Sequence, residues 1–161
     1  MRVRKGLIGF VAVVQTVLFL THFLLYETWT YAPGADRTRE AWWLGLVLVL
    51  LSMSFVAASL LAFRYTNAAV RLFYRAAAVW LGLLTFLVIA AVSSWIIFAV
   101  AGLAGLSIGF HRVVEVLSII AVAAGLYGVF NAGFTRITRT TVRLANLPAA
   151  WHGRKAALIS D

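Results

Sequence analysis

The chain has 161 residues, of which 63% are hydrophobic and only 12% are charged, and its mean hydropathy is +0.97. This composition excludes an ordinary soluble domain and indicates an integral membrane protein. The formal net charge of +9 suits either nucleic acid or anionic lipid as a partner, so the positions of the charges must decide between them. Because cysteine is absent, disulfide bonds and thiolate metal sites are excluded.

The first predicted membrane span is the apolar run of 21 residues at 6–26, which follows the basic start Met1–Lys5. About 20 apolar residues are needed to cross a hydrocarbon core. A cleaved signal peptide would have a shorter apolar region, roughly 7–15 residues, before an Ala-x-Ala-like site, so we expect an uncleaved helix. The polar connection that follows, 27–41, is flanked by aromatic residues of the kind found at the headgroup level, Trp29, Tyr31, Trp42 and Trp43.

The second predicted span covers 42–63. Its Ser54, Ala58 and Ala62 repeat every four residues and predict a narrow face on which another helix packs closely. The basic segment 64–75 comes next and has no acidic residue to balance its charges. We expect a cytosolic loop in which Arg64, Arg71 and Arg75 contact anionic phospholipids, rather than a nucleic-acid site, because aromatic residues and arginines beside a bilayer already have an interfacial role.

The third and fourth spans are predicted at 79–100 and 116–134. The chain has no charge over 35 residues from Ala76 to Phe110, which as one helix would measure about 52 Å, far more than a hydrocarbon core of ~30 Å. The segment 101–115 is therefore expected to form an interfacial turn or a partly re-entrant piece, as its glycines favour. A second small-residue face, Ala124, Gly128 and Ala132, is predicted in the last span and would also allow a homo-oligomer. The fold class is thus all-α, with a transmembrane domain at 1–134.

Beyond this domain the sequence changes character. The arginines Arg136, Arg139 and Arg143 are spaced by three and four residues, which predicts a basic juxtamembrane linker at 135–154 that contacts anionic lipid. At 155–161 a short apolar run leads to Asp161. This pattern is typical of a buried strand that presents a carboxylate at its end, and a frayed polar tail is the alternative.

The C-terminal residues resemble a junction found in bacterial membrane-anchored metallophosphoesterases of the calcineurin-like superfamily. The resemblance is carried by Tyr127-Gly128, Asn131-Ala132, Leu147–Trp151, Gly153-Arg154 and Leu158–Asp161. It implies that 155–161 begins a truncated α/β catalytic domain in which Asp161 is a metal ligand. The remaining motifs of that domain lie outside the chain, so the two divalent ions that the resemblance implies, of the Mn, Fe, Zn or Mg class, would belong to the longer protein.

Two functions are consistent with this sequence. In the first, the chain is the membrane anchor of a metal-dependent phosphoesterase, and the catalytic domain that it would hold is missing from the chain. In the second, it is a complete four-helix scaffold or subunit that binds lipid or a protein partner without catalysis. Transport is disfavoured because no Asp, Glu, Lys or Arg falls in the middle of a predicted span.

Four polar residues would gather near the outer ends of the predicted spans: His22, Glu27, His111 and Glu115. A metal or proton site can be built from such residue types. The alternative is that the two glutamates are solvated at helix ends and that His22 makes a hydrogen bond between helices, as polar residues in membrane bundles do.

The distribution of positive charge predicts a multi-pass protein with both termini in the cytoplasm, and the resemblance implies that the membrane is the bacterial inner membrane. Eleven of the 14 lysines and arginines fall in the segments assigned to the inside, with three at 2–5, three at 64–75 and five at 136–155. A single cysteine introduced at Ala35 should react with an impermeant thiol reagent in intact cells, whereas one at Ala149 should not. Labelling at Ala149 in place of Ala35 would contradict this topology.

Overall fold

The computed structural model consists of four long helices and describes residues 2–31, 39–134 and 148. The helices are α1 (Arg2–Thr30), α2 (Arg39–Arg64), α3 (Ala68–Leu103) and α4 (Phe110–Ala132). Each contains an apolar stretch long enough to cross a membrane. No strand occurs within the described ranges. For this part of the chain the prediction of an all-α protein with four helices able to span a membrane is confirmed.

Several predictions concern residues that lie outside these ranges. They are the linker at 135–154, of which only Pro148 is described, with Arg136, Arg139 and Arg143, and the strand start at 155–161 with Asp161. All of these remain predictions.

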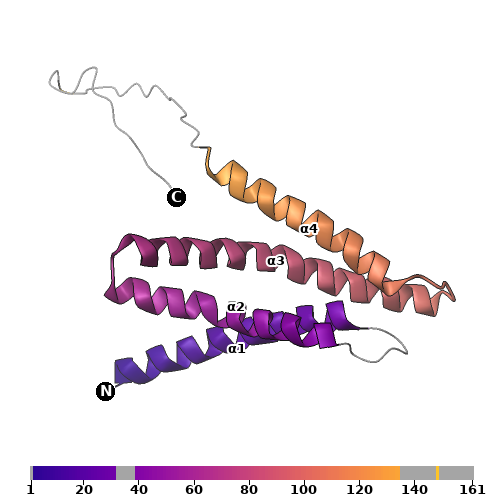
Figure 1. Ribbon diagram of the computed structural model, residues 1–161, viewed down its shortest axis with the longest axis horizontal. Coiled ribbons are helices and arrows are strands. Elements are labelled where there is room, and N and C mark those ends of the chain that lie inside the picture. The colour runs from indigo at the N-terminus through magenta and orange to yellow at the C-terminus, as the bar shows by residue number, and fades with distance from the viewer. Residues whose placement is uncertain (1, 32–38, 135–147, 149–161) are drawn as a thin grey trace.

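Helix α3 is the centre of the bundle and contacts each of the other three helices. In Figure 1, α1 and α2 lie together on one side of α3, and α4 diverges from α3 so that its C-terminal end stands apart. Successive helices run in opposite directions. The α2–α3 connection therefore lies at one end of the bundle, the basic end, defined by Arg64, Arg71 and Arg75. The α3–α4 connection lies at the other, the aromatic end, defined by Tyr31 and Phe110.

At the basic end only three residues, Tyr65 to Asn67, separate α2 from α3. The Asn67 Oδ1 accepts a hydrogen bond from the backbone N–H of Val70 at 2.8 Å, so Asn67 caps a helix that begins at Ala68. The prediction of a loop across 64–75 is therefore wrong. Arg71 and Arg75 lie in the first turns of α3, because the sequence after Asn67 contains no helix breaker to delay the start until residue 79.

At the aromatic end a tight turn joins α3 to α4, so of the two alternatives predicted for 101–115 the structure has the turn and not the partly re-entrant piece. Gly105 has a φ of +71°, and the backbone N–H groups of Gly105 and Leu106 donate to the carbonyls of Gly102 and Ala101. This pair of bonds is a Schellman motif, which satisfies the last carbonyls of α3 and reverses the chain within a few residues. Helix α4 can therefore start at Phe110, six residues earlier than predicted.

Helix α1 also continues past its predicted end at Tyr26. The hydroxyl groups of Thr28 and Thr30 donate to the carbonyls of Leu24 and Tyr26, at 2.7 and 2.8 Å. Because each hydroxyl is satisfied by the preceding turn of its own helix, these polar residues do not end α1 in the membrane. The helix ends at Thr30.

The buried core is mainly leucine and alanine, and α3 contributes half of it. The core residues are Leu18, Leu25, Leu48, Leu84, Leu87, Ala90, Ala91 and Ala121. In α2, the predicted small-residue face is only partly used, since Ala58 is fully buried, Ser54 is half-buried and Ala62 is exposed. Small side chains let helix backbones approach closely where lipid removes the hydrophobic drive for association.

The small-residue face predicted in α4 is not the one that packs against α3. The buried line runs through Val114, Ser118, Ala121 and Gly125. A Cβ added at Gly125 would lie 2.7 Å from the Leu83 Cδ1, so α4 packs closely against α3 at this glycine. The predicted residues Gly128 and Ala132 are exposed instead, because they occupy a neighbouring stripe and lie on the part of α4 that diverges from α3.

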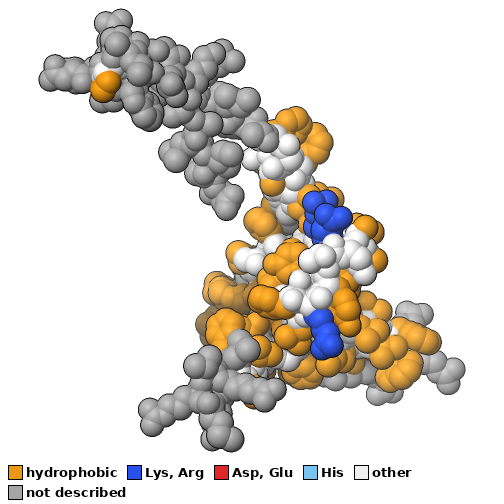
Figure 2. Space-filling model, turned by 90° about the vertical axis from the view of Figure 1, so that its left-hand side faces the viewer, with side chains coloured by type: hydrophobic (Ala, Val, Ile, Leu, Met, Phe, Trp, Pro, Cys, Tyr) orange, Lys and Arg blue, Asp and Glu red, His pale blue; other side chains and the backbone are white. Residues whose placement is uncertain are grey.

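The outer surface of the bundle is strongly apolar, as expected for helices in contact with lipid. Figure 2, seen toward the basic end, shows hydrophobic side chains over most of the described surface, and Lys or Arg side chains in two small groups among them. Trp29, Trp42 and Trp43 are exposed, in agreement with a headgroup location at the aromatic end. Tyr31 packs inward instead.

Replacing Gly125 by leucine should separate α3 from α4, because the new side chain must enter the space held by Leu83 and Phe86. Overpacking of this kind costs roughly 1–3 kcal/mol. Gly128→Leu is the matched control, because nothing lies within 4 Å of a Cβ at that position. We expect the Gly125→Leu variant, and not the Gly128→Leu variant, to unfold at a lower concentration of denaturing detergent than the wild type, as followed by circular dichroism. Equal effects would contradict the α3–α4 packing.

Candidate functional site

The bundle contains a small set of buried polar side chains, and those between α1 and α3 form the candidate site. The buried polar residues of the described ranges are His22, Thr28, Ser52, Ser94 and Ser118. Every buried side-chain nitrogen and oxygen atom in these ranges has a hydrogen-bond partner. This is the condition for placing polar groups in hydrocarbon, where no water can satisfy them.

His22 links α1 to α3. Its Nδ1 lies 2.7 Å from the carbonyl oxygen of Leu18, and its Nε2 accepts a hydrogen bond from the Trp80 Nε1–H at 3.0 Å. A carbonyl and an indole N–H have fixed roles as acceptor and donor, so the geometry assigns the neutral imidazole with the proton on Nδ1. Neither ring nitrogen then has a free lone pair for a metal ion or a free proton to give.

A second contact of the same kind lies nearer the aromatic end. The Trp95 Nε1–H donates to the Thr28 Oγ1 at 3.0 Å, and that hydroxyl donates in turn to the carbonyl of Leu24. Thr28 is completely buried. The helices α1 and α3 are therefore joined by two indole hydrogen bonds, each accepted by an α1 side chain whose own proton goes to a carbonyl of α1.

The helix α1 is also bonded to α2. The Gln15 side chain donates from Nε2 to the carbonyl oxygen of Ser52 at 3.1 Å, while the buried Ser52 hydroxyl donates to the carbonyl of Val49. These contacts add to the polar links between helices that hydrocarbon favours.

Aromatic rings close the bundle at the aromatic end. Tyr31 makes edge contacts with Trp95 and Phe110, with centroid distances of 4.8 and 5.1 Å, and Phe98 joins the group. Phe110 is buried among them. Edge-to-face packing of this kind adds stabilisation beyond burial alone. The cluster fixes the start of α4 against the end of α1 and fills the space that a re-entrant segment would need.

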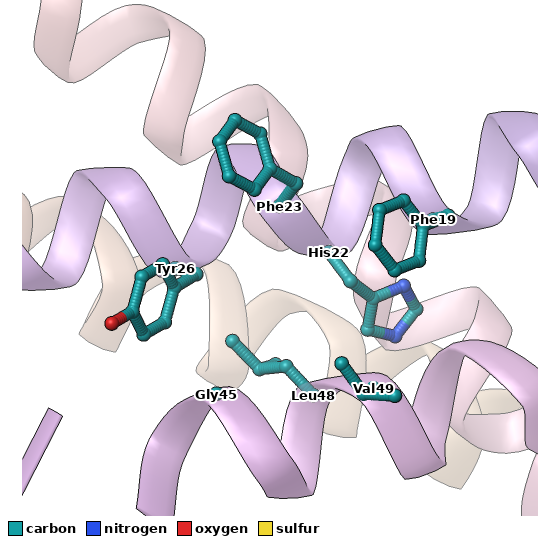
Figure 3. A pocket seen from close by; sticks show the side chains of 7 residues that line it. All are labelled: Phe19, His22, Phe23, Tyr26, Gly45, Leu48 and Val49. Carbon is teal, nitrogen blue, oxygen red and sulfur yellow. The ribbon is translucent and has the colours of Figure 1, made fainter. Parts of the chain in front are cut away.

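An apolar crevice lies beside His22 on the side facing α2. Its volume is about 210 Å³, and Figure 3 shows that α1 and α2 both line it. The lining residues are Phe19, His22, Phe23, Tyr26, Gly45, Leu48 and Val49. Gly45 keeps the two helices close, since an added Cβ would lie 3.3 Å from the Tyr26 ring. Because His22 already uses both ring nitrogens, the crevice offers apolar contact and no reactive group.

The structure places His22 apart from His111 and Glu115, two other residues of the predicted metal or proton site. His22 is buried, whereas His111 and Glu115 are exposed on the first turns of α4. His22 precedes Tyr31, the α1 residue that contacts the start of α4, by nine residues, a rise of about 13 Å along the helix. Within the described ranges no three His, Asp or Glu residues are placed to hold a metal ion. The hydrogen bond between helices expected of His22 is confirmed.

The two glutamates differ in their surroundings. Glu115 is exposed near the start of α4, as expected, but Glu27 is half-buried within the last turn of α1 because that helix extends to Thr30. Of the predicted lipid-contact residues, Arg64, Arg71 and Arg75 are all exposed at the basic end.

Sequence reasoning missed Trp80, Trp95 and Thr28, which make most of the link between α1 and α3. A signal for them was present. Both tryptophans lie well inside long apolar segments, where an indole N–H has no acceptor unless another helix supplies one. The acceptors His22 and Thr28 can also be seen in the sequence, among others. They lie 58 and 67 residues from their tryptophan donors, so the pairing depends on how the helices are arranged.

Comparison with known proteins gives no family for this chain, so any proposal about its function rests on its own sequence and structure. No protein-family model, curated protein or solved structure matches it. The described geometry defines a membrane bundle with satisfied polar contacts, an apolar crevice and a basic end.

The bond between His22 and Trp80 can be measured with a double-mutant cycle of His22→Leu and Trp80→Phe. The expected coupling is about 1 kcal/mol, within the range found for side-chain hydrogen bonds in membrane bundles. A matched cycle of His22→Leu with Trp95→Phe should be additive, because the Trp95 indole bonds to Thr28 instead. Unfolding of the purified protein by added denaturing detergent provides the free energies. A coupling no larger than in the matched cycle would show that the bond contributes nothing.

Proposed function

We propose that this four-helix region is a membrane anchor, and that it holds a metal-dependent phosphoesterase domain at the cytoplasmic surface of a bacterial inner membrane. The observation that supports the anchor role most directly is the state of the polar groups in the spans. His22 is committed to hydrogen bonds at both ring nitrogens. The charged residues of the described helices lie within about two turns of the ends of the spans, as with Glu27 and Arg112.

In the described helices, polar contacts join one helix to another, and the buried His22 uses both ring nitrogens in hydrogen bonds. Intramembrane ionisable residues normally mark a transport pathway or a relay. The helices therefore suit the role of an anchor, which holds another segment of the protein at the membrane.

The phosphoesterase part of the proposal is supported by the C-terminal resemblance and by chemistry. A carboxylate such as Asp161 is a hard anionic ligand for the divalent ions that activate water and neutralise charge on a phosphoryl group. The described residues offer no alternative metal-binding group.

The test uses the extended protein that carries the residues after Asp161, with added Mn²⁺ and with model phosphodiesters and phosphomonoesters. Asp161→Asn should lower turnover by more than the roughly 10–100-fold that follows loss of an outer-shell partner, and should lower the bound metal content. The control Glu115→Gln, at an exposed position at the opposite end of the bundle, should leave both unchanged. Unaltered turnover and metal content in Asp161→Asn would refute the assignment.

A complete scaffold without catalysis is the second candidate, and two features favour it. The crevice beside His22 is apolar and partly open, and the small residues Gly128 and Ala132 remain exposed on α4. Both could receive a lipid chain or a helix of a partner. A stop codon directly after Asp161 in the natural gene would favour the scaffold, and a continuation of the coding sequence would favour the anchor.

A further inference from the structure

The basic end contains a groove that is separate from the contacts between α1 and α3. It lies where the last turn of α2 meets the first turns of α3, and its volume is about 390 Å³. Its polar lining comes from Tyr65, Thr66, Arg71, Tyr74 and Arg75, and its apolar lining from Ala62 and Val70. The short connection capped by Asn67 fixes the two walls relative to each other.

The groove is positively charged. Arg71 and Arg75 are one helical turn apart and therefore lie on the same face of α3. Arg64 stands with its guanidinium carbon 6.0 Å from the centre of the Tyr65 ring, beside the groove. The sequence has no Asp or Glu between residues 41 and 114, so neither helix supplies a carboxylate to neutralise these arginines.

The residues around the groove place it at the level of the lipid headgroups. Phe63 and Leu72, on the two helices that form the groove, are 91% and 70% exposed, as suits side chains that face hydrocarbon in the two candidate spans. Tyr65 and Tyr74 have the amphipathic character of residues at a membrane boundary. Because apolar side chains and arginines share these few turns, the boundary between hydrocarbon and headgroups must pass through them.

From this arrangement we propose that the groove binds the phosphodiester headgroup of an anionic phospholipid. The guanidinium group presents a planar fork of donors that matches two phosphate oxygens, and the hydroxyls of Thr66 and the tyrosines can add further donors. The apolar lining of the groove, Ala62 and Val70, would contact the apolar part of the same lipid next to its headgroup. A soluble phosphate would gain none of this apolar contact, so the groove is matched to a lipid in particular. This inference does not depend on the phosphoesterase proposal.

The experiment measures lipid retained by the purified full chain after extraction from mixed phosphatidylglycerol and phosphatidylcholine vesicles, by native mass spectrometry. The wild type should retain phosphatidylglycerol in preference to phosphatidylcholine. The double variant Arg71→Gln/Arg75→Gln should retain it roughly tenfold less, since two charge-assisted contacts are removed. The matched control Arg112→Gln removes an exposed arginine at the aromatic end and should bind as the wild type does.

The proposal would be overturned by equal retention by the double variant and the control, by equal retention of the two lipids by the wild type, or by displacement of phosphatidylglycerol by an equal concentration of inorganic phosphate. If the double variant loses its helical circular dichroism signal, the lipid preference of the wild type and the competition with inorganic phosphate still test the proposal. Raising NaCl from about 0.1 to 1 M shortens the screening length from ~10 to ~3 Å and should weaken retention of phosphatidylglycerol. Retention that is insensitive to salt would equally refute a headgroup site.

Discussion

The structure depends on one constraint, which is that hydrocarbon offers no hydrogen bonds to polar groups. Two indole N–H groups of α3 project from apolar segments, and each finds its acceptor on α1, at His22 and at Thr28. The acceptors are themselves held by carbonyls of their own helix, which orients them before the helices meet. The pairing of α1 with α3 is thus specified by polar groups, while leucine and alanine supply the packing around them.

The same constraint explains why a polar side chain such as His22 forms hydrogen bonds inside the bundle and is not available for chemistry. A histidine in a membrane span is usually read as part of a metal site or a proton relay. At His22 the indole of Trp80 occupies the nitrogen lone pair that either role would need. Charge is confined to the ends of the helices, where α2 and α3 bring three arginines together at one end. The division between a neutral interior and a basic end is compatible with the membrane anchor that we propose.

Much of the fold could be predicted from the sequence, because the length of each apolar run fixes a span. The errors fell where local hydrogen bonds decided the outcome. Asn67 capped α3 early, Gly105 allowed a tight turn, and Thr28 and Thr30 satisfied their hydroxyls within α1. Which face of α4 packs was also missed, because small residues occur on two of its stripes and only the approach of Leu83 distinguishes Gly125 from Gly128. The partners of Trp80 and Trp95 required the arrangement of the helices, which no local pattern contains.

The length of α3 has a consequence for the membranes in which the protein can reside. With 36 residues it measures about 54 Å, so spanning a ~30 Å hydrocarbon core by tilt alone would take more than 50°, outside the observed range of 0–40°. One end of α3 must therefore project beyond the hydrocarbon core. The first turns of α3, which carry Arg71 and Arg75, are its polar end. A thicker or thinner bilayer would move the boundary along this continuous helix without disturbing the contacts of Trp80 and Trp95 farther on. A continuous helix of this length is therefore expected to fit bilayers of different thickness.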